Sequence, residues 1–231
     1  MPEVILFDAG GTLVLQSAVA LSERLGYPIA AEDAFEAHYR SMHAYARRRL
    51  AGVDGGWAWW QEHYFSALRV PDPDLAGERV NNGFGMWFHP IAGTIEAITD
   101  LAQSGIRVAV LSNSDGSVTE SLARAGFDGL FEMVLDSHDL GVSKPDPAIF
   151  RLALERMQVQ PSRTWYVGDS IFHDVGGATT AGLARAILID PLGLHDHYLD
   201  RIRSVAELPD LVRSGRGDGD EKVVPDTSTQ R

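Results

Sequence analysis

Apolar positions near the start of the chain change from a continuous run to a helical repeat. Residues 4–7 form an apolar run that ends at Asp8, which predicts a short buried strand followed by a loop. From residue 14 to residue 88, apolar positions recur at helical spacing, for example at Phe35, Tyr39 and Met42. This spacing predicts a helical insertion of about four segments, with no convincing buried strand in it.

From Pro90 onward, strand-like and helix-like segments alternate. The predicted helices span residues 91–103, 117–125, 147–157 and 175–181, and the predicted strands span residues 106–111, 131–135, 164–167 and 185–189. Repeated strand–helix units form a parallel sheet with helices on both faces and right-handed connections. The predicted fold class is therefore α/β, with a doubly wound parallel sheet and an inserted helical unit.

These changes of pattern predict three parts of the chain. The α/β core domain comprises residues 1–13 and 89–213, and the helical insertion comprises residues 14–88. The final segment, residues 214–231, is rich in Gly, Asp, Ser and Thr and lacks large aromatic residues. Such a composition predicts a disordered tail.

Composition narrows the class of protein. The chain has 231 residues, of which 45% are hydrophobic and 23% charged, as is typical of soluble globular proteins. The net charge of −12 argues against a nucleic-acid partner, which requires a positive surface. The sequence has no cysteine, which excludes disulfides and cysteine-bound zinc. No apolar run has the length of a membrane span or signal peptide, so we expect a cytoplasmic protein with no membrane partner.

Polar residues follow several of the predicted strands directly. Asp8 follows the first strand, Ser112 and Asn113 follow strand 106–111, and Asp169 follows strand 164–167, with Asp174 close behind. In an open parallel sheet, ligands bind at the carboxyl ends of the strands. Clustered carboxylates at that edge would suit Mg²⁺, which prefers oxygen ligands.

Four of these segments, taken in order, resemble the motifs of the haloacid dehalogenase-like (HAD) hydrolase superfamily. They contain Asp8, Ser112, Lys144 and Asp169, and the sequences at 144–150 and 176–182 match the motif surroundings. The resemblance covers residues 3 to about 212. It implies a Rossmann-like core, with the insertion acting as a cap that closes over the cleft and contacts the leaving group.

The resemblance implies a nucleophile and a metal site. Asp8 would attack phosphorus and form an aspartyl-phosphate. Mg²⁺ would be held by Asp8, Asp169 and the main-chain carbonyl of Gly10, with Asp174 nearby, through water or as a partner of Lys144. The metal would act as a Lewis acid and as a template.

The resemblance also implies the groups that bind the phosphate. Ser112 and Asn113 would donate hydrogen bonds to the transferring phosphoryl group, and Lys144 would neutralise charge on it and on Asp8. Thr12 matches the motif threonine that helps to fix the first loop. Gly10 and Gly11 are expected to let the main chain approach the phosphate and to adopt positive φ angles.

Gly10 departs from the phosphatase pattern, because those enzymes usually carry a second aspartate there that protonates the leaving group. Loss of a general acid or base lowers rates by roughly 10²–10⁴-fold. We therefore expect a Mg²⁺-dependent phosphatase of a small phosphorylated metabolite that is slow on alkyl phosphates, or one that uses a substitute acid. His173, His43 and His63 are conceivable substitutes.

Other readings of the same motifs remain open. Haloacid dehalogenases also lack an acid at this position, although they generally lack the acidic pair seen here at Asp169 and Asp174. A phosphate-binding protein that has lost turnover is a third possibility, motivated by Gly10. Phosphonoacetaldehyde hydrolases need a cap lysine, and the insertion has none, since the lysines are Lys144 and Lys222.

Cap residues that could select the substrate are less clearly marked. Successive helical residues point about 100° apart, so at most one or two of residues 47–49, all arginines, could enter the cleft. Trp57 and Trp60 follow the apolar stripe and are expected in the core. Trp59 and His63 share a different face by their i, i+4 spacing and are expected in the cleft or at an interface.

Overall fold

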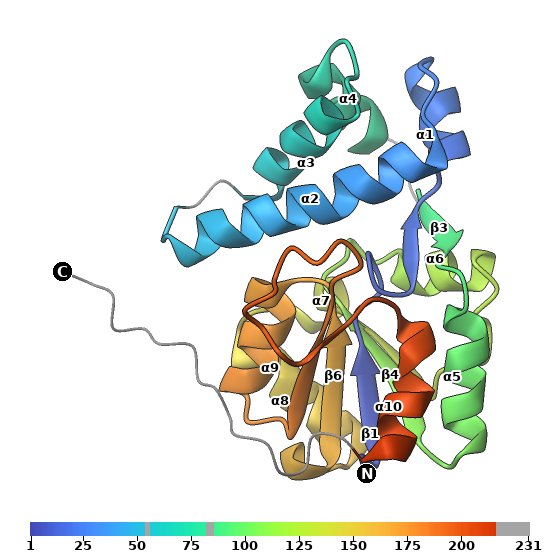
Figure 1. Cartoon of the computed structure of the whole chain (residues 1–231), viewed down its shortest axis with the longest axis vertical. Helices are drawn as coiled ribbons and strands as arrows, with labels where there is room; N and C mark the ends of the chain where they lie inside the picture. Colours follow the sequence, from blue (N-terminus) through green and yellow to red (C-terminus); the bar gives the residue numbers. More distant parts are fainter. Residues whose placement is uncertain (54–55, 82–85, 216–231) are drawn as a thin grey trace.

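The chain forms a sheet-containing core with a separate layer of helices above one edge of the sheet (Figure 1). The computed structural model describes residues 1–53, 56–81 and 86–215. The predicted tail begins at Ser214, which instead ends the last helix, α10 (Leu208–Ser214). Residues 216–231, the rest of the predicted tail, lie outside the described residues.

Six parallel strands form the main sheet, in the order β5-β4-β1-β6-β7-β8. Their bounds are β1 Val4–Phe7, β4 Arg107–Ser112, β5 Met133–Asp136, β6 Thr164–Gly168, β7 Arg185–Ile189 and β8 Arg201–Ile202. The register aligns Phe7 of β1 with Val110 of β4 and Val167 of β6. Because β1 lies between β4 and β6, the residues that follow these three strands meet at one edge.

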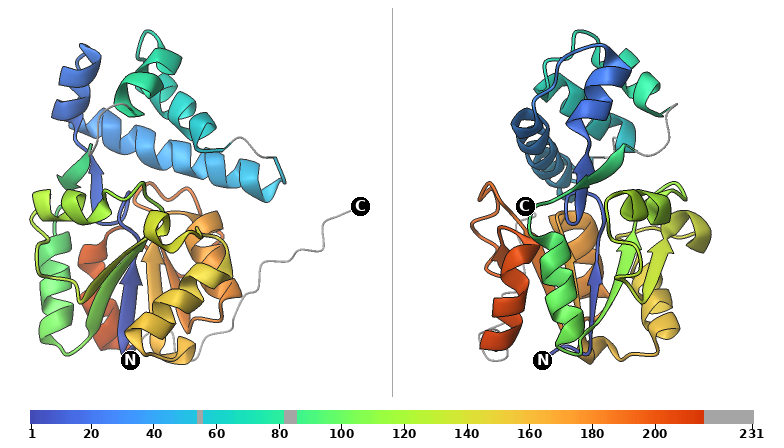
Figure 2. Two further views of the ribbon diagram at one scale, coloured as in Figure 1. Left: turned by 180° about the vertical axis from the view of Figure 1, so that it is seen from behind. Right: turned by 90° about the vertical axis from the view of Figure 1, so that its right-hand side faces the viewer.

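Helices cover both faces of this sheet, as the two views of Figure 2 show. The core helices are α5 Thr94–Gln103, α6 Val118–Arg124, α7 Ser137–Leu140, α8 Pro147–Met157, α9 Gly177–Thr180 and α10, and the short helices η1 Pro161–Arg163, η2 Ile171–Gly176 and η3 Val205–Glu207 lie between them. Side chains alternate along a strand, so Ile5 and Phe7 of β1 join one hydrophobic cluster and Val4 and Leu6 join the other. Burial on both faces explains why this strand is an unbroken apolar run. The doubly wound α/β fold is confirmed.

Between β2 (Val14–Gln16) and β3 (Trp87–Pro90) the chain forms the inserted helices α1 Ala18–Leu25, α2 Ala31–Leu50, α3 Gly56–Ala67 and α4 Pro73–Asn81. These four helices, which we call the cap, have a hydrophobic cluster of their own that includes Trp60, Tyr64 and Phe65. The four predicted helical segments are therefore present. The prediction that this region contains no buried strand is wrong, because all three residues of β2 are buried.

The strand that the pattern missed connects the cap to the core. β2 and β3 pair antiparallel, with Val14 opposite Pro90 and a register shift between Leu15 and Gln16. A strand of three residues is too short to show the alternation by which strands are recognised in a sequence. None of the helices in the described ranges has the length and apolarity needed to cross a membrane.

Candidate active site

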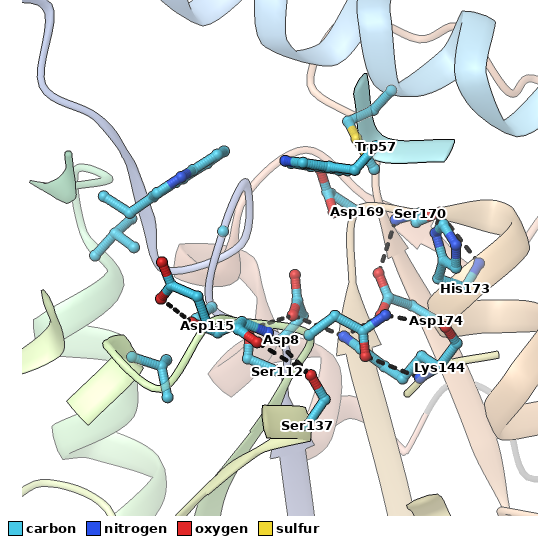
Figure 3. A pocket seen from close by; sticks show the side chains of 18 of the residues that line it. Asp8, Trp57, Ser112, Asp115, Ser137, Lys144, Asp169, Ser170, His173 and Asp174 are labelled. Carbon is cyan, nitrogen blue, oxygen red and sulfur yellow. Dashed lines mark hydrogen bonds and ion pairs between the residues drawn. The ribbon is translucent and has the colours of Figure 1, made fainter. Parts of the chain in front are cut away.

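The loops after β1, β4 and β6 bring the predicted site residues to one cleft beneath the cap (Figure 3). Asp8 follows β1, Ser112 ends β4 and Asp169 follows β6. The three side chains line a cavity of about 640 Å³ together with Lys144 and Asp174. The topology of the sheet therefore brings these five residues together, although Asp8 and Asp174 lie 166 positions apart in the sequence.

Lys144 lies between two of the carboxylates. Its Nζ donates to Oδ1 of Asp8 and to Oδ1 of Asp174, each at 2.7 Å. Ser112 Oγ donates to the same oxygen of Asp8 at 3.1 Å. Burial alone would lower the pKa of Lys144, but Asp174 and Asp8 outweigh it and raise that pKa above its ordinary value. The ammonium is therefore held in its charged form against Asp8.

Two side chains fix Lys144 in this position. The hydroxyl of Tyr166 accepts from Lys144 Nζ at 2.8 Å and lies 2.8 Å from the carbonyl oxygen of Leu111. Asn113 donates from Nδ2 to the carbonyl of Lys144 and accepts from its main-chain N–H. The amide of Asn113, expected to face a phosphate, is thus engaged with the main chain of Lys144. Neither Tyr166 nor this use of Asn113 was predicted.

Asp8, Asp169 and Asp174 form a buried group that can hold a metal ion. One oxygen from each lies within 4.8 Å of the others. Burial raises the pKa of all three carboxyl groups. The negative charge of a neighbour raises each pKa further: Asp174 acts on Asp8, Asp8 acts on Asp169, and Asp169 acts on Asp174. Three acidic oxygens facing one ammonium leave negative charge that a hard divalent cation would neutralise.

Asp174 is positioned by a short π-helix, η2, rather than by a regular helix. The main-chain N–H of Ser170 donates to Asp174 Oδ2 at 2.9 Å, while Lys144 holds the other oxygen. Both oxygens of this buried carboxylate therefore have donors. π-Helical turns are rare and occur often at functional sites.

The first loop approaches the carboxylates closely at Gly11. Gly11 has a φ of +73°, and a Cβ there would overlap both Asp169 Oδ2 and His38 Nε2. Gly10 is absent from the positive-φ residues, so the expectation of a positive φ is confirmed for Gly11 and wrong for Gly10. Thr12 is 1% exposed and does not line the cavity. Its hydroxyl has no hydrogen-bond partner among the residues that the structure describes.

His38 of the cap is a site residue that the sequence did not reveal. Its Nε2 lies 2.7 Å from Asp169 Oδ2, and both side chains are buried. The residues of α2 that line the cleft are His38, Met42, Tyr45 and Arg49. Their i, i+4, i+7, i+11 spacing describes one helix face, and this mixed polar and aromatic stripe was the signal available in the sequence. Of the three consecutive arginines, Arg49 alone lines the cavity.

The three histidines considered as substitute acids lie in different places, and only His173 lines the cleft. His173 lines the cleft, and burial, aided by Lys144 and Arg49, lowers its pKa to about 3. It is therefore neutral at physiological pH. His43 faces His195 outside the cleft, with 3.0 Å between His43 Nδ1 and His195 Nε2. His63 is exposed and stacks on Trp59.

The expectation for the cap tryptophans is partly wrong. Trp60 is buried as expected, at 1% exposure, but Trp57 is 46% exposed and lines the cleft. The indole rings of Trp57 and Trp60 stack with centroids 4.3 Å apart, so the apolar stripe continues from the cap interior into the cleft. Trp59 stacks on His63 instead and does not line the cavity.

Comparison with known proteins agrees with this geometry. The sequence matches the haloacid dehalogenase-like hydrolase family over residues 2–182. It is 29% identical over 192 residues to haloacid dehalogenase-like hydrolase domain-containing protein 3 of Mus musculus, covering 79% of this chain and 76% of that protein. It is 35% identical over 157 residues to glyceraldehyde 3-phosphate phosphatase of Methanopyrus kandleri, covering 62% of this chain and 66% of that enzyme.

Solved structures share the whole fold. The HAD-hydrolase YfnB from Bacillus subtilis, solved bound to magnesium, superposes with a TM-score of 0.65 at 22% identity, covering 92% of this chain and 99% of that one. Several solved dehalogenases have the same fold at 21% to 25% identity. The family match includes the segments that carry Asp8, Ser112, Lys144, Asp169 and Asp174. The chain belongs to the haloacid dehalogenase-like hydrolases.

Proposed function

We propose that this hydrolase is a Mg²⁺-dependent phosphatase that acts on a small phosphorylated metabolite through an aspartyl-phosphate at Asp8. The observation that carries the proposal is the placement of Lys144 between Asp8 and Asp174, with Asp169 completing a buried acidic group. The phosphatase named among the relatives and the magnesium-bound structure of the same fold support the reaction type and the ion.

Asp8, Asp169 and Asp174 would hold the ion. When bound, Mg²⁺ supplies positive charge between these carboxylates and the phosphoryl oxygens. Burial is the first cause of the raised pKa of each carboxylate, and this cost of burying negative charge supports a site that a cation would stabilise. The carbonyl of Gly10 remains available to a metal, since a main-chain ligand does not depend on the side chain.

The chain's own groups orient the nucleophile. Ser112 and Lys144 both donate to Oδ1 of Asp8, which fixes the plane of the carboxylate before substrate arrives. Asp8 then attacks phosphorus, and the bond from phosphorus to the leaving oxygen breaks. Water subsequently attacks the phosphorus of the aspartyl-phosphate and releases phosphate and the Asp8 carboxylate. Lys144, held by Tyr166, would neutralise phosphoryl charge throughout.

The phosphatase proposal is tested most directly on p-nitrophenyl phosphate. We expect hydrolysis that requires added Mg²⁺, is abolished by chelator and falls by at least about 10³-fold in Asp8→Asn. Asp115→Asn is the matched control, because Asp115 lines the same cleft but bonds to Ser114 and Ser117. Full activity in Asp8→Asn would overturn the assignment of the nucleophile.

Further assays separate the alternatives. A dehalogenase would release chloride from 2-chloropropionate in the presence of chelator, whereas the buried acidic group and its lysine favour metal-dependent chemistry. A binding protein without turnover, the reading motivated by Gly10, would bind Mg²⁺ and phosphate and yield no product with any phosphate ester.

A further inference from the structure

An aromatic ring occupies the space that a side chain at residue 10 would enter. A Cβ added to Gly10 would lie 3.1 Å from Cζ3 and 3.2 Å from Cε3 of Trp87. A methyl group could be accepted if the ring moved by a few tenths of an ångström, but the carboxyl group of an aspartate extends further. Gly10 and Trp87 are therefore a matched pair, since the indole excludes the acid that the glycine lacks.

Trp87 cannot swing aside easily. Its ring makes an edge contact with His38 at 5.5 Å between centroids and lies 6.1 Å from the ring of Trp60. It packs against the hydrophobic clusters of both the core and the cap. Displacing the ring would disturb both clusters, and protein interiors resist such shifts.

Beside this ring, the cap side of the cleft is largely apolar and aromatic. The apolar and aromatic lining residues there are Met42, Tyr45, Trp57, Val80, Met86 and Trp87, and the polar ones are Gln16, His38, Arg49 and Gln61. Trp57 faces the site from the cap, above Asp169 in Figure 3, and its ring is 46% exposed. Flat aromatic walls favour a flat apolar ligand group, because stacking adds to the burial of apolar area.

Each histidine that lines the cleft has a hydrogen-bond partner at one ring nitrogen. The histidines that line the cleft within the described ranges are His38 and His173. Nε2 of His38 is bonded to Asp169, and Nδ1 of His173 lies 3.3 Å from Ser170 Oγ. With glycine at residue 10, no carboxylic acid at that position can protonate the leaving oxygen, which favours leaving groups that are stable as anions.

We propose that the Gly10–Trp87 contact makes this cleft selective for aryl phosphate monoesters, whose leaving group is planar, apolar and stable as a phenolate. The inference rests on the proposed phosphatase function. In the first step Asp8 oxygen bonds to phosphorus while the P–O(aryl) bond breaks, and its electron pair leaves with the phenolate. In the second step the oxygen of water bonds to phosphorus while the bond from phosphorus to the Asp8 oxygen breaks, and its electron pair returns to the Asp8 carboxylate. Both protons of the water stay with the phosphate, which leaves as H₂PO₄⁻, and solvent protonates the phenolate.

Phenyl, benzyl and cyclohexyl phosphates allow the planarity of the leaving group to be tested separately from its stability as an anion. Phenyl and benzyl are planar, whereas benzyl and cyclohexyl leave as alkoxides. We expect phenyl phosphate to have a kcat at least about 100-fold above that of the other two, because neither alkoxide receives a proton. We expect phenyl and benzyl phosphates to share a low KM, about tenfold below that of cyclohexyl phosphate, through stacking.

Variants at the pair test its role directly. Trp87→Ala should raise KM about tenfold for phenyl and benzyl phosphates and leave cyclohexyl phosphate nearly unchanged, and Trp87→Phe should restore the low KM. Trp59→Ala, an aromatic deletion on the cap outside the cleft, is the control. Gly10→Asp alone should not improve benzyl phosphate turnover, whereas the double variant Gly10→Asp/Trp87→Ala should raise its kcat about 10²-fold or more over Trp87→Ala.

Equal turnover of cyclohexyl and phenyl phosphates, with Asp8 still required, would overturn this selectivity and leave the phosphatase proposal intact. A gain from Gly10→Asp in the presence of Trp87 would show that the ring does not exclude the acid and would overturn the paired role. If no ester is hydrolysed in an Asp8-dependent way, the proposed function fails, and this inference fails with it.

Discussion

Nε2 of His38, on the cap helix α2, lies 2.7 Å from Oδ2 of Asp169, which is 131 positions further along the chain. The side chains are 3% and 2% exposed. Asp169 also belongs to the acidic group that can hold a metal. The position of the cap on the core and the geometry of the candidate metal site are therefore joined through this hydrogen bond.

Removing His38 should weaken metal binding. Outer-shell partners orient metal ligands, and their loss typically lowers metal affinity by roughly 10–100-fold. We expect a decrease of that size in the Mg²⁺ affinity of His38→Ala, measured by isothermal titration calorimetry. His63→Ala, a histidine exposed on the cap, should bind as the wild type does. Tighter binding in His38→Ala would instead mean that His38 competes with the ion for Asp169.

Gly11→Ala should damage the site beyond the strain of its backbone. A side chain at a positive φ costs about 1–2 kcal/mol, and a Cβ at Gly11 also overlaps Asp169 and His38. Gly105→Ala is a matched control, because Gly105 has a φ of +84° and no atom within 4 Å of the added Cβ. We expect both variants to lose stability in urea, Gly11→Ala the more because of the overlap, and only Gly11→Ala to lose Mg²⁺ binding.

If the two glycine variants bind Mg²⁺ equally well, the close approach at Gly11 does not shape the acidic group. The φ strain would then account for the whole effect.

A comparison of Tyr166→Phe with Tyr198→Phe should separate the effect of a lost tyrosine hydroxyl on stability from its effect on catalysis. Tyr166 bonds the carbonyl of Leu111 and Lys144 Nζ, whereas Tyr198 donates only to the carbonyl of Ala186. A buried carbonyl left without its donor costs about 1–3 kcal/mol, so both Phe variants should lose that amount in urea unfolding. Only Tyr166→Phe should lower kcat, because Lys144 loses an acceptor. Equal kcat values in the two variants would remove Tyr166 from the catalytic arrangement.

The strands of the core were predictable for a physical reason. A strand buried on both faces must be apolar at every position, and the run from Val4 to Phe7 shows this directly. A parallel sheet then brings the ends of its strands to one edge, so Asp8, Ser112 and Asp169 could be expected to meet. Short strands cannot be predicted in this way. β2 has three residues and β8 has two, which is too few to show a repeating pattern of apolar positions.

The cap residues of the cleft were not predictable in the same way. Helical spacing gives the relative directions of residues on one helix, such as Trp57 and Trp59 on α3, but not which direction faces the core. That choice depends on how the cap sits on the β2–β3 pair, whose existence the sequence pattern missed. The result is that Trp57, expected in the core, lines the cleft, whereas Trp59, expected in the cleft or at an interface, does not line it.

A second contact between cap and core lies outside the cleft. Nδ1 of His43 on α2 lies 3.0 Å from Nε2 of His195, in the segment after β7. Burial lowers the pKa of both histidines, that of His195 from 6.5 to about 4. Arg47 lowers the pKa of His43 further, and His43 and Arg201 lower that of His195 further. His197 also lowers both pKa values, and Asp190 raises both.

This pair should make stability fall with acidity. A histidine whose pKa is lower in the folded state binds fewer protons there than when unfolded, so between pH 6.5 and 4 the free energy of unfolding decreases as pH falls. His195→Gln retains a polar group at the position of Nε2 but cannot titrate, so its stability should depend less on pH over this window. His63→Gln, altered at an exposed histidine of the cap, should follow the wild type. Urea unfolding at several pH values measures the three dependences, and parallel curves for wild type and His195→Gln would mean that the pair does not link cap closure to protonation.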